Sequence, residues 1–114
     1  MDIEALQKFC LSFPSVTEDI KWDHDLVFSI GGKMFCIVSL DTPFKCSFKV
    51  EDDEFEEIIF HEGFVQAPYL ARAKWVLVDV QTKLNEKEWK QAIDKSYRLV
   101  CAKLTKKLRA ELGI

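Results

Sequence analysis

The sequence predicts an α+β domain of two layers, in which helices cover one face of a mainly antiparallel sheet. Its 114 residues match the size of one domain, and no linker or internal repeat divides residues 1–114. Several strand-like segments follow one another through turn residues rather than through helices. Segments with helical periodicity stand at both ends of the chain and once between strands. The expected order of elements is therefore α-β-β-β-(β)-α-β-α.

The N-terminal helix is expected over residues 2–12. Apolar side chains recur there at spacings of three and four, which places them on one helical face. Asp2 and Glu4 suit the positive end of the helix dipole, and Pro14 prevents the helix from continuing.

Strand signals fill residues 16–50. The Gly31-Gly32 pair between two β-rich runs predicts a tight hairpin, because both turn positions can take a positive φ. Asp41-Thr42-Pro43 predicts a further turn. Residues 45–50 alternate in character, which predicts one covered sheet face and one more hydrated face. The side chains expected on the covered face are Cys46, Phe48 and Val50.

A short middle helix is expected over residues 51–61, where four carboxylates crowd the first turn. Residues 67–71 can form a single helical turn that begins at Pro68. Residues 73–80 are rich in valine and predict another strand.

The last helix is expected to start at a capping box made by Asn85 and Glu88 and to run to about residue 111. Apolar side chains from Trp89 to Leu108 step by three or four along it and form one stripe. Basic side chains cluster nearly opposite that stripe, namely Lys95, Arg98, Lys106 and Arg109.

The composition indicates a cytoplasmic protein. The longest apolar runs have the length of a strand, far below the roughly 20 residues of a membrane helix, and the N-terminus lacks the pattern of a signal peptide. The four cysteines form no CxxC pair and sit in apolar stretches, so we expect buried free thiols rather than metal ligands or disulfides. They are Cys10, Cys36, Cys46 and Cys101.

No catalytic constellation is visible, so neither an enzyme nor a bound cofactor or metal is expected. His24 and His61 lie in no motif, and no serine stands in a GxSxG elbow. Gly31-Gly32-Lys33 joins two strands and lacks the spacing of a phosphate-binding loop. The carboxylates of residues 51–57 lack the alternation and the central glycine of a calcium loop.

The net charge of −3 is unevenly divided along the chain. Residues 1–81 carry 7 basic and 15 acidic side chains, a balance of −8. Residues 82–114 carry 9 basic and 4 acidic side chains, a balance of +5. The C-terminal segment can therefore contact phosphates, while the acidic remainder repels a nucleic acid wherever it faces one.

An ordered series of short segments resembles the MmcQ/YjbR family of small bacterial proteins. The segments are Phe13-Pro14-Ser15-Val16-Thr17-Glu18, Trp22, Gly32-Lys33-Met34-Phe35, Lys45-Cys46, Gly63-Phe64, Ala67-Pro68-Tyr69-Leu70, Lys74-Trp75-Val76, Ser96-Tyr97-Arg98-Leu99-Val100 and Lys103-Leu104. Three family patterns, Leu-Pro-Gly, Pro-Trp-Gly and Leu-Pro-Lys-Lys, are altered. They read here Phe13-Pro14-Ser15, Lys21-Trp22-Asp23 and Leu104-Thr105-Lys106-Lys107.

The resemblance implies a helix packed on an antiparallel sheet, with a long C-terminal helix, in the fold shared with secretion chaperones and with CyaY. It also implies a double-wing type of DNA binding, and it brings no catalytic residues. The positions that can serve DNA binding are Lys45, Lys49, Arg72, Lys74, Lys103, Lys106 and Lys107.

Three hypotheses of function follow from the sequence. In the first, the basic face of the last helix contacts double-stranded DNA and the hairpin at Gly31-Gly32 acts as a wing. In the second, a half-covered sheet takes up a protein partner, as a chaperone-like module does. In the third, a deep pocket with a histidine and a carboxylate would make an enzyme or a small-ligand binder. A continuous basic surface favours the first, and an apolar patch on the open sheet face favours the second.

Overall fold

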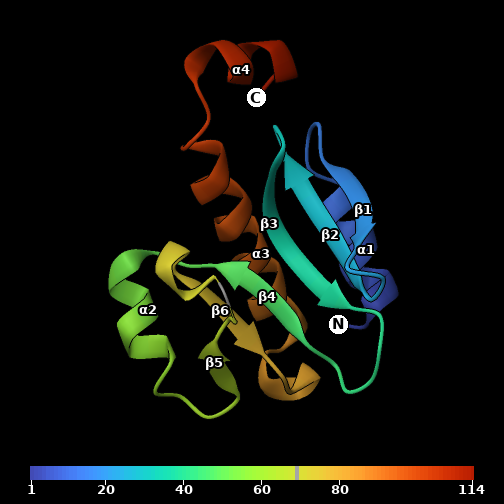
Figure 1. Cartoon of the computed structure of the whole chain (residues 1–114), viewed down its shortest axis with the longest axis vertical. Coiled ribbons are helices and arrows are strands. Elements are labelled where there is room, and N and C mark those ends of the chain that lie inside the picture. The colour runs from blue at the N-terminus through green and yellow to red at the C-terminus, as the bar shows by residue number, and fades with distance from the viewer. Residues whose placement is uncertain (69) are drawn as a thin grey trace.

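A computed structural model describes residues 1–68 and 70–114 and confirms the predicted α+β architecture. Six strands form one antiparallel sheet in the order β1-β2-β3-β4-β6-β5 within this described part (Figure 1). The strands are β1 (Thr17–Lys21), β2 (Asp25–Ile30), β3 (Lys33–Ser39), β4 (Cys46–Lys49), β5 (Phe64–Gln66) and β6 (Trp75–Val78). The helices are α1 (Ile3–Leu11), α2 (Asp52–Ile58), α3 (Glu86–Cys101) and α4 (Lys106–Leu112), with 3-10 turns η1 (Ala71–Ala73) and η2 (Gln81–Lys83).

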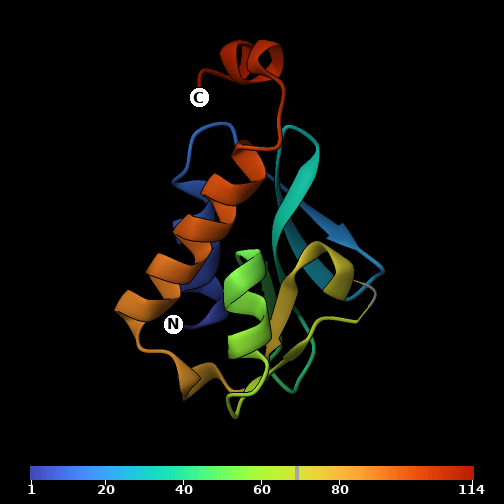
Figure 2. The same ribbon diagram turned by 90° about the vertical axis from the view of Figure 1, so that its left-hand side faces the viewer.

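The helices α1 and α3 cover one face of the sheet, and the opposite face stays open to the viewer of Figure 1 (Figures 1 and 2). The main core lies between these two layers. Its largest fully buried side chains include Trp89 and Ile93 of α3 and Phe28 and Phe35 of the sheet. The residues predicted for the covered face all belong to this core, so the alternation of residues 45–50 identified the sheet face correctly.

The open face is less hydrated than its sequence indicates. Val27, Ile37, Ala67 and Trp75 form a second buried apolar cluster on this side. Two of these residues come from the later part of the sheet: Ala67 directly follows β5, and Trp75 is the first residue of β6. Sequence alternation within one strand cannot reveal such a cluster, because its members come from separate segments of the chain.

Four elements differ from their predicted positions. The middle helix expected over residues 51–61 spans only Asp52–Ile58. The strand β5 was not predicted, because its three residues are too few to show alternation. The helical turn expected over residues 67–71 lies later, at Ala71–Ala73, and Tyr69 of that expected turn is outside the described residues. The strand expected over residues 73–80 covers only Trp75–Val78.

The prediction of one C-terminal helix to about residue 111 is wrong. The helix α3 ends at Cys101, and α4 begins after Thr105, whose side-chain oxygen accepts a hydrogen bond from the backbone N–H of Leu108 at 3.1 Å. Threonine is a favourable N-cap, so it starts a new helix at this point. The break is invisible in the apolar stripe, because Leu104 and Leu108 both still pack on the core.

The hairpin between β2 and β3 packs on the junction of α3 and α4. Gly31 and Gly32 both have positive φ, at 60° and 80°, as the sequence predicts. A Cβ atom on Gly31 would lie 2.8 Å from the Cδ1 atom of Leu104, whereas a Cβ atom on Gly32 would meet only open space. The first glycine therefore serves both the turn and a close approach, while the second serves the turn alone.

Ser96 joins α3 to two strands that separate from each other. The pairing of β3 with β4 ends at Cys36 and Phe48. Beyond that point the buried Ser96 hydroxyl donates to the carbonyl oxygen of Phe35 at 2.6 Å and accepts from the N–H of Lys49 at 2.9 Å. One side chain thus satisfies the two backbone groups that the sheet leaves unpaired.

We expect Gly31→Ala to destabilise the fold more than Gly32→Ala. The left-handed backbone penalises alanine at both positions by about 1 kcal/mol. At Gly31 the added methyl group must also displace Leu104, which raises the expected loss to about 3 kcal/mol. Urea unfolding of the two variants measures the difference, and equal losses would show that the hairpin does not pack tightly on Leu104.

We expect Ser96→Ala to lower the free energy of unfolding by about 1–3 kcal/mol, because it leaves a buried N–H and a buried C=O without partners. Ser29→Ala is the matched control. Ser29 is partly buried in β2, and its hydroxyl makes no hydrogen bond to any residue that the structure describes. A similar loss in both variants, measured by thermal or urea unfolding, would contradict a bridging role for Ser96.

Candidate functional site

Three of the seven predicted DNA-contacting residues come together near the end of β4, where β3 and β4 stop pairing. Lys49 ends β4, Lys74 directly precedes β6, and Lys103 follows the end of α3. Lys49 and Lys74 are partly buried, and Lys103 is exposed. We call Lys49, Lys74 and Lys103, together with Lys106 and Lys107 at the start of α4, the lysine surface.

The electrostatics of Lys49 show that the first three lysines are neighbours. Burial lowers the pKa of Lys49 below its usual value, and the positive charge of Lys103 lowers it further. Asp52 opposes this effect, and Lys74 adds a smaller lowering. The Nζ atom of Lys49 donates a hydrogen bond to the carbonyl oxygen of Ala73, which directs this ammonium toward the turn before β6.

Several basic residues elsewhere in the described part of the chain are already paired. Lys95, which was predicted to belong to the basic helix face, lies 3.0 Å from Glu54, and Arg98 lies 3.1 Å from Asp94. No ion pair joins any member of the lysine surface to a carboxylate of the described residues. The ion pairs found there involve Lys8, His24, Lys90, Lys95 and Arg98.

The other predicted contacts are distributed differently. Lys106 and Lys107 are exposed in the first turn of α4, which contains no acidic residue. Arg72 is exposed in η1. Lys45 precedes β4 and so lies about 13 Å from Lys49 at the opposite end of that strand. The break after α3 also means that Lys106 does not continue the helical face of Lys95.

The hairpin at Gly31-Gly32 does not project freely as a wing. Its Gly31 side faces Leu104 and Leu108, and only the Gly32 side faces open space. Any contribution of this hairpin to binding would therefore come from its exposed side, where Lys33 is also exposed.

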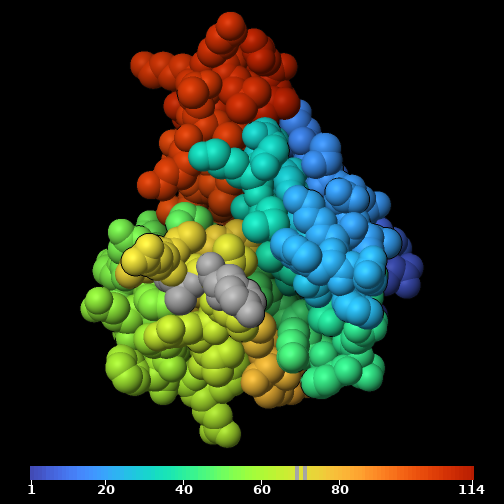
Figure 3. Space-filling model, in the orientation of Figure 1, coloured from blue at the N-terminus to red at the C-terminus, as the bar shows by residue number. Residues whose placement is uncertain are grey.

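A groove of about 480 Å³ opens on the uncovered face of the sheet. The groove is on the face of the sheet opposite α1 and α3, which is the face turned toward the viewer in Figure 3. Strands β2, β3, β4 and β6 form its floor, and the chain before η1 and the β1–β2 turn form its rim. The lining residues are Trp22, Asp25, Met34, Ile37, Ser39, Lys45, Ser47, Ala67, Pro68, Leu70 and Leu77.

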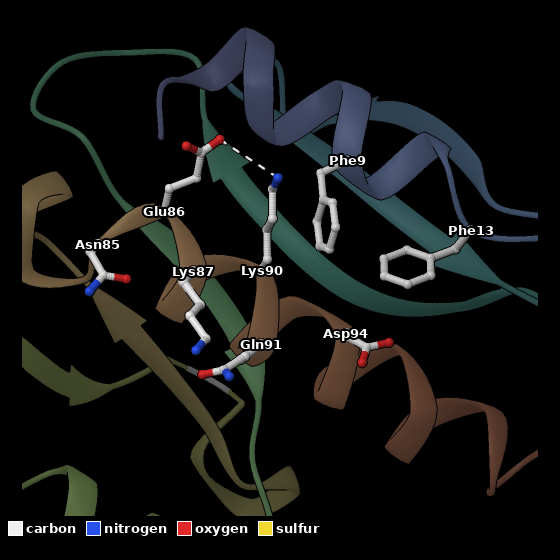
Figure 4. Close-up of a pocket in the computed structure, with 8 residues that line it drawn as sticks. All are labelled: Phe9, Phe13, Asn85, Glu86, Lys87, Lys90, Gln91 and Asp94. Atoms are coloured by element: carbon white, nitrogen blue, oxygen red, sulfur yellow. Dashed lines mark ion pairs between the residues drawn. The ribbon is translucent and has the colours of Figure 1, made fainter.

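A second hollow lies between α1 and α3 and is shallow and open (Figure 4). Lys90 pairs with Glu86 at 3.7 Å across one helical turn, and its Nζ atom lies 5.8 Å from the centre of the Phe9 ring. The Lys90 ammonium therefore already has a carboxylate and an aromatic ring as partners within the protein. We therefore assign no ligand to this hollow.

The histidines and cysteines form no reactive centre within the described residues. The Nδ1 atom of His24 lies 2.9 Å from Asp41, with both side chains mostly exposed, and His61 is exposed. The Cys36 and Cys46 sulfur atoms lie 3.8 Å apart in the core as free thiols. A hydrogen bond with Cys36 and burial both raise the pKa of Cys46 well above its usual value, which keeps this thiol neutral. No group of three potential metal ligands meets in this part of the chain.

Trp22 is the functional candidate that sequence reasoning left open. Its side chain is 61% exposed, whereas Trp75 is buried. Its backbone has a φ of 53°, which is strained for a bulky residue, and Asp23 follows with 65°. The sequence singled out Trp22 only through the family resemblance and did not show that its side chain is exposed. Among the helices described, none is long and apolar enough to cross a membrane.

Comparisons with known proteins agree with this architecture. A crystal structure of a Deinococcus radiodurans protein with a DUF419 domain has a TM-score of 0.88 at 26% identity, covering 98% of this chain and 88% of the other. A Pseudomonas syringae protein has a TM-score of 0.72 at 16% identity, covering 87% of this chain and 98% of the other, and so shares the fold.

Neither of these names states an activity or a ligand. No curated protein matches the chain. The family model described as YjbR matches residues 11–99, which is most of the chain. The chain therefore belongs to the YjbR family.

Proposed function

We propose that the protein binds nucleic acid through the lysine surface, by contacts with the phosphate backbone. The observation that carries this proposal is the meeting of Lys49, Lys74 and Lys103, from three separate segments, without a carboxylate paired to any of them in the described structure. Phosphate contacts by lysine are the main source of sequence-independent affinity for nucleic acid.

Like charges held together favour the binding of an anion. Burial lowers the pKa of Lys49 most, and the positive charges of Lys103 and Lys74 lower it further, so its protonated form is disfavoured in the free protein. A bound phosphate would reverse this effect by placing negative charge among the three ammonium groups. Lys106 and Lys107 extend the positive surface along the start of α4.

The acidic helix α2 limits the side from which a nucleic acid can approach. Asp52, Asp53 and Glu54 lie in the first turn of α2, directly after the end of β4, and Asp52 acts on the charge of Lys49. These carboxylates repel a phosphate backbone. We therefore place the duplex or single strand toward Lys103, Lys106 and Lys107, away from α2.

A protein-binding or chaperone-like role has weaker support. The apolar cluster on the open face is largely buried by Ala67 and Trp75 of the same chain, so a broad apolar patch is not exposed there. The exposed apolar side chains of the described residues lie on separate elements, such as Phe60 after α2 and Ile20 in β1.

We expect Lys74→Gln/Lys103→Gln to weaken binding to a labelled random-sequence duplex roughly tenfold at low salt, because two phosphate contacts are lost. The slope of log K against log salt concentration should decrease in magnitude by about 2, and the loss should not depend on sequence. Fluorescence anisotropy over a salt series measures both quantities, and a single strand of equal length shows which form is preferred.

Lys8→Gln/Lys90→Gln is the matched control for this experiment. It removes the same charge, but both lysines are already paired, with Glu4 and Glu86. We expect its affinity and salt slope to stay close to those of the wild type. Equal weakening by the two double variants, or no binding by the wild type at low salt, would refute the lysine surface as a nucleic-acid interface.

A further inference from the structure

The floor of the open-face groove has an apolar row beside a polar row. One row of strand partners runs across the sheet through Val27, Ile37, Ser47 and Leu77. A second row joins Asp25 to Ser39, whose N–H donates to the carbonyl oxygen of Lys45. The groove therefore presents an apolar surface next to a carboxylate, hydroxyls and an ammonium group.

The two charged groups of the groove are available to a ligand. Asp25 and Lys45 both line it, yet no ion pair joins them to each other or to another described residue. Their backbones are separated by β3, a distance of about 10 Å across two strand spacings. A small molecule with both charges can bridge this gap, because the lysine side chain is long and flexible.

Trp22 completes the rim of the groove at a structural cost. The Trp22 side chain is exposed, so burial does not stabilise it. Its φ of 53° lies in the left-handed region, which is unfavourable for a residue with a Cβ atom. Strained residues of this kind concentrate at ligand sites, where the surrounding structure holds them. The indole face also attracts a cationic group, since tryptophan is the best partner for a cation–π contact.

The charges around the groove argue against a phosphate ligand. Asp19, Asp23 and Asp25 of the β1–β2 hairpin outnumber Lys21 and Lys45 on this side. A nucleic-acid backbone would meet net negative charge here, so the groove is distinct in its chemistry from the lysine surface. A ligand with an ammonium group and no net negative charge suits it better.

We propose that the groove binds an apolar α-amino acid. The ammonium group pairs with the Asp25 carboxylate beside the Trp22 indole, and the carboxylate pairs with Lys45 and the Ser47 hydroxyl. The side chain packs on Met34, Ile37, Leu70 and Leu77. The volume of about 480 Å³ falls within the roughly 300–1,000 Å³ of small-molecule sites, and charge-assisted hydrogen bonds at both ends provide the specificity.

The test compares three probes of one shape, L-phenylalanine, L-phenylalaninamide and 3-phenylpropionate, none of which interferes with tryptophan fluorescence. Trp22 is the exposed reporter, because Trp75 and Trp89 are buried, and Trp22→Phe identifies its share of the emission. We expect phenylalanine to bind best. The amide keeps a carbonyl oxygen but loses the negative charge, so its contact with Lys45 should be weaker, and 3-phenylpropionate, which lacks the amine, should bind at least about tenfold more weakly. Calorimetry of the same titrations gives the affinities independently.

Asp25→Asn should weaken phenylalanine binding about tenfold and remove the preference over 3-phenylpropionate. Lys45→Gln should remove the preference for phenylalanine over its amide. Asp19→Asn is the matched control, because Asp19 lies on the same side of the sheet, one strand from Val27, but does not line the groove. Unfolding curves confirm that each variant is folded.

Three outcomes would overturn the proposal: no binding of phenylalanine up to about 10 mM, equal binding of 3-phenylpropionate, or equal weakening by Asp25→Asn and Asp19→Asn.

Discussion

The hydrogen bonds of Ser96 are the constraint on which the arrangement of the molecule depends. The strands β3 and β4 pair over only three residues and then separate, which leaves backbone groups of Phe35 and Lys49 without sheet partners. The Ser96 hydroxyl of α3 satisfies both within the core, where an unpaired group would be costly. It thereby fixes the end of β4 to α3. Since Lys103 follows α3, the lysine surface owes its geometry to this buried serine.

The two faces of the sheet have separate uses. The helix-covered face supplies the main core, in which Trp89 donates a hydrogen bond to the carbonyl oxygen of Gln81 and Tyr97 donates one to that of Pro14. The open face carries a small cluster and a groove with unpaired charges. The lysine surface lies at the C-terminal end of β4, where β3 and β4 stop pairing, whereas Lys45 lies at the N-terminal end of β4. The two proposed binding surfaces therefore share no side chain.

Two of the departures from the family pattern fall on positions with a positive φ. Ser15 and Asp23 stand where the pattern has glycine, and both have positive φ, at 60° and 65°. Ser15 is held by a hydrogen bond from its hydroxyl to the carbonyl oxygen of Leu112 at 2.7 Å. Thr105 stands where the pattern has proline. Proline ends a helix because it lacks an N–H donor, and Thr105 separates α3 from α4 by capping instead.

The sequence by itself determined the class of fold, the Gly31-Gly32 hairpin, the capping box at Asn85 and the covered face of β4, because these depend on local periodicity and turn chemistry. Tertiary structure alone decided the break at Thr105, the apolar cluster on the open face and the exposure of Trp22. It also decided which lysines are unpaired, since Lys95 finds Glu51 and Glu54 more than 40 positions earlier in the chain, at 3.6 and 3.0 Å. Contacts between distant segments leave no periodic signal, so the sequence alone could name basic residues but could not place them together.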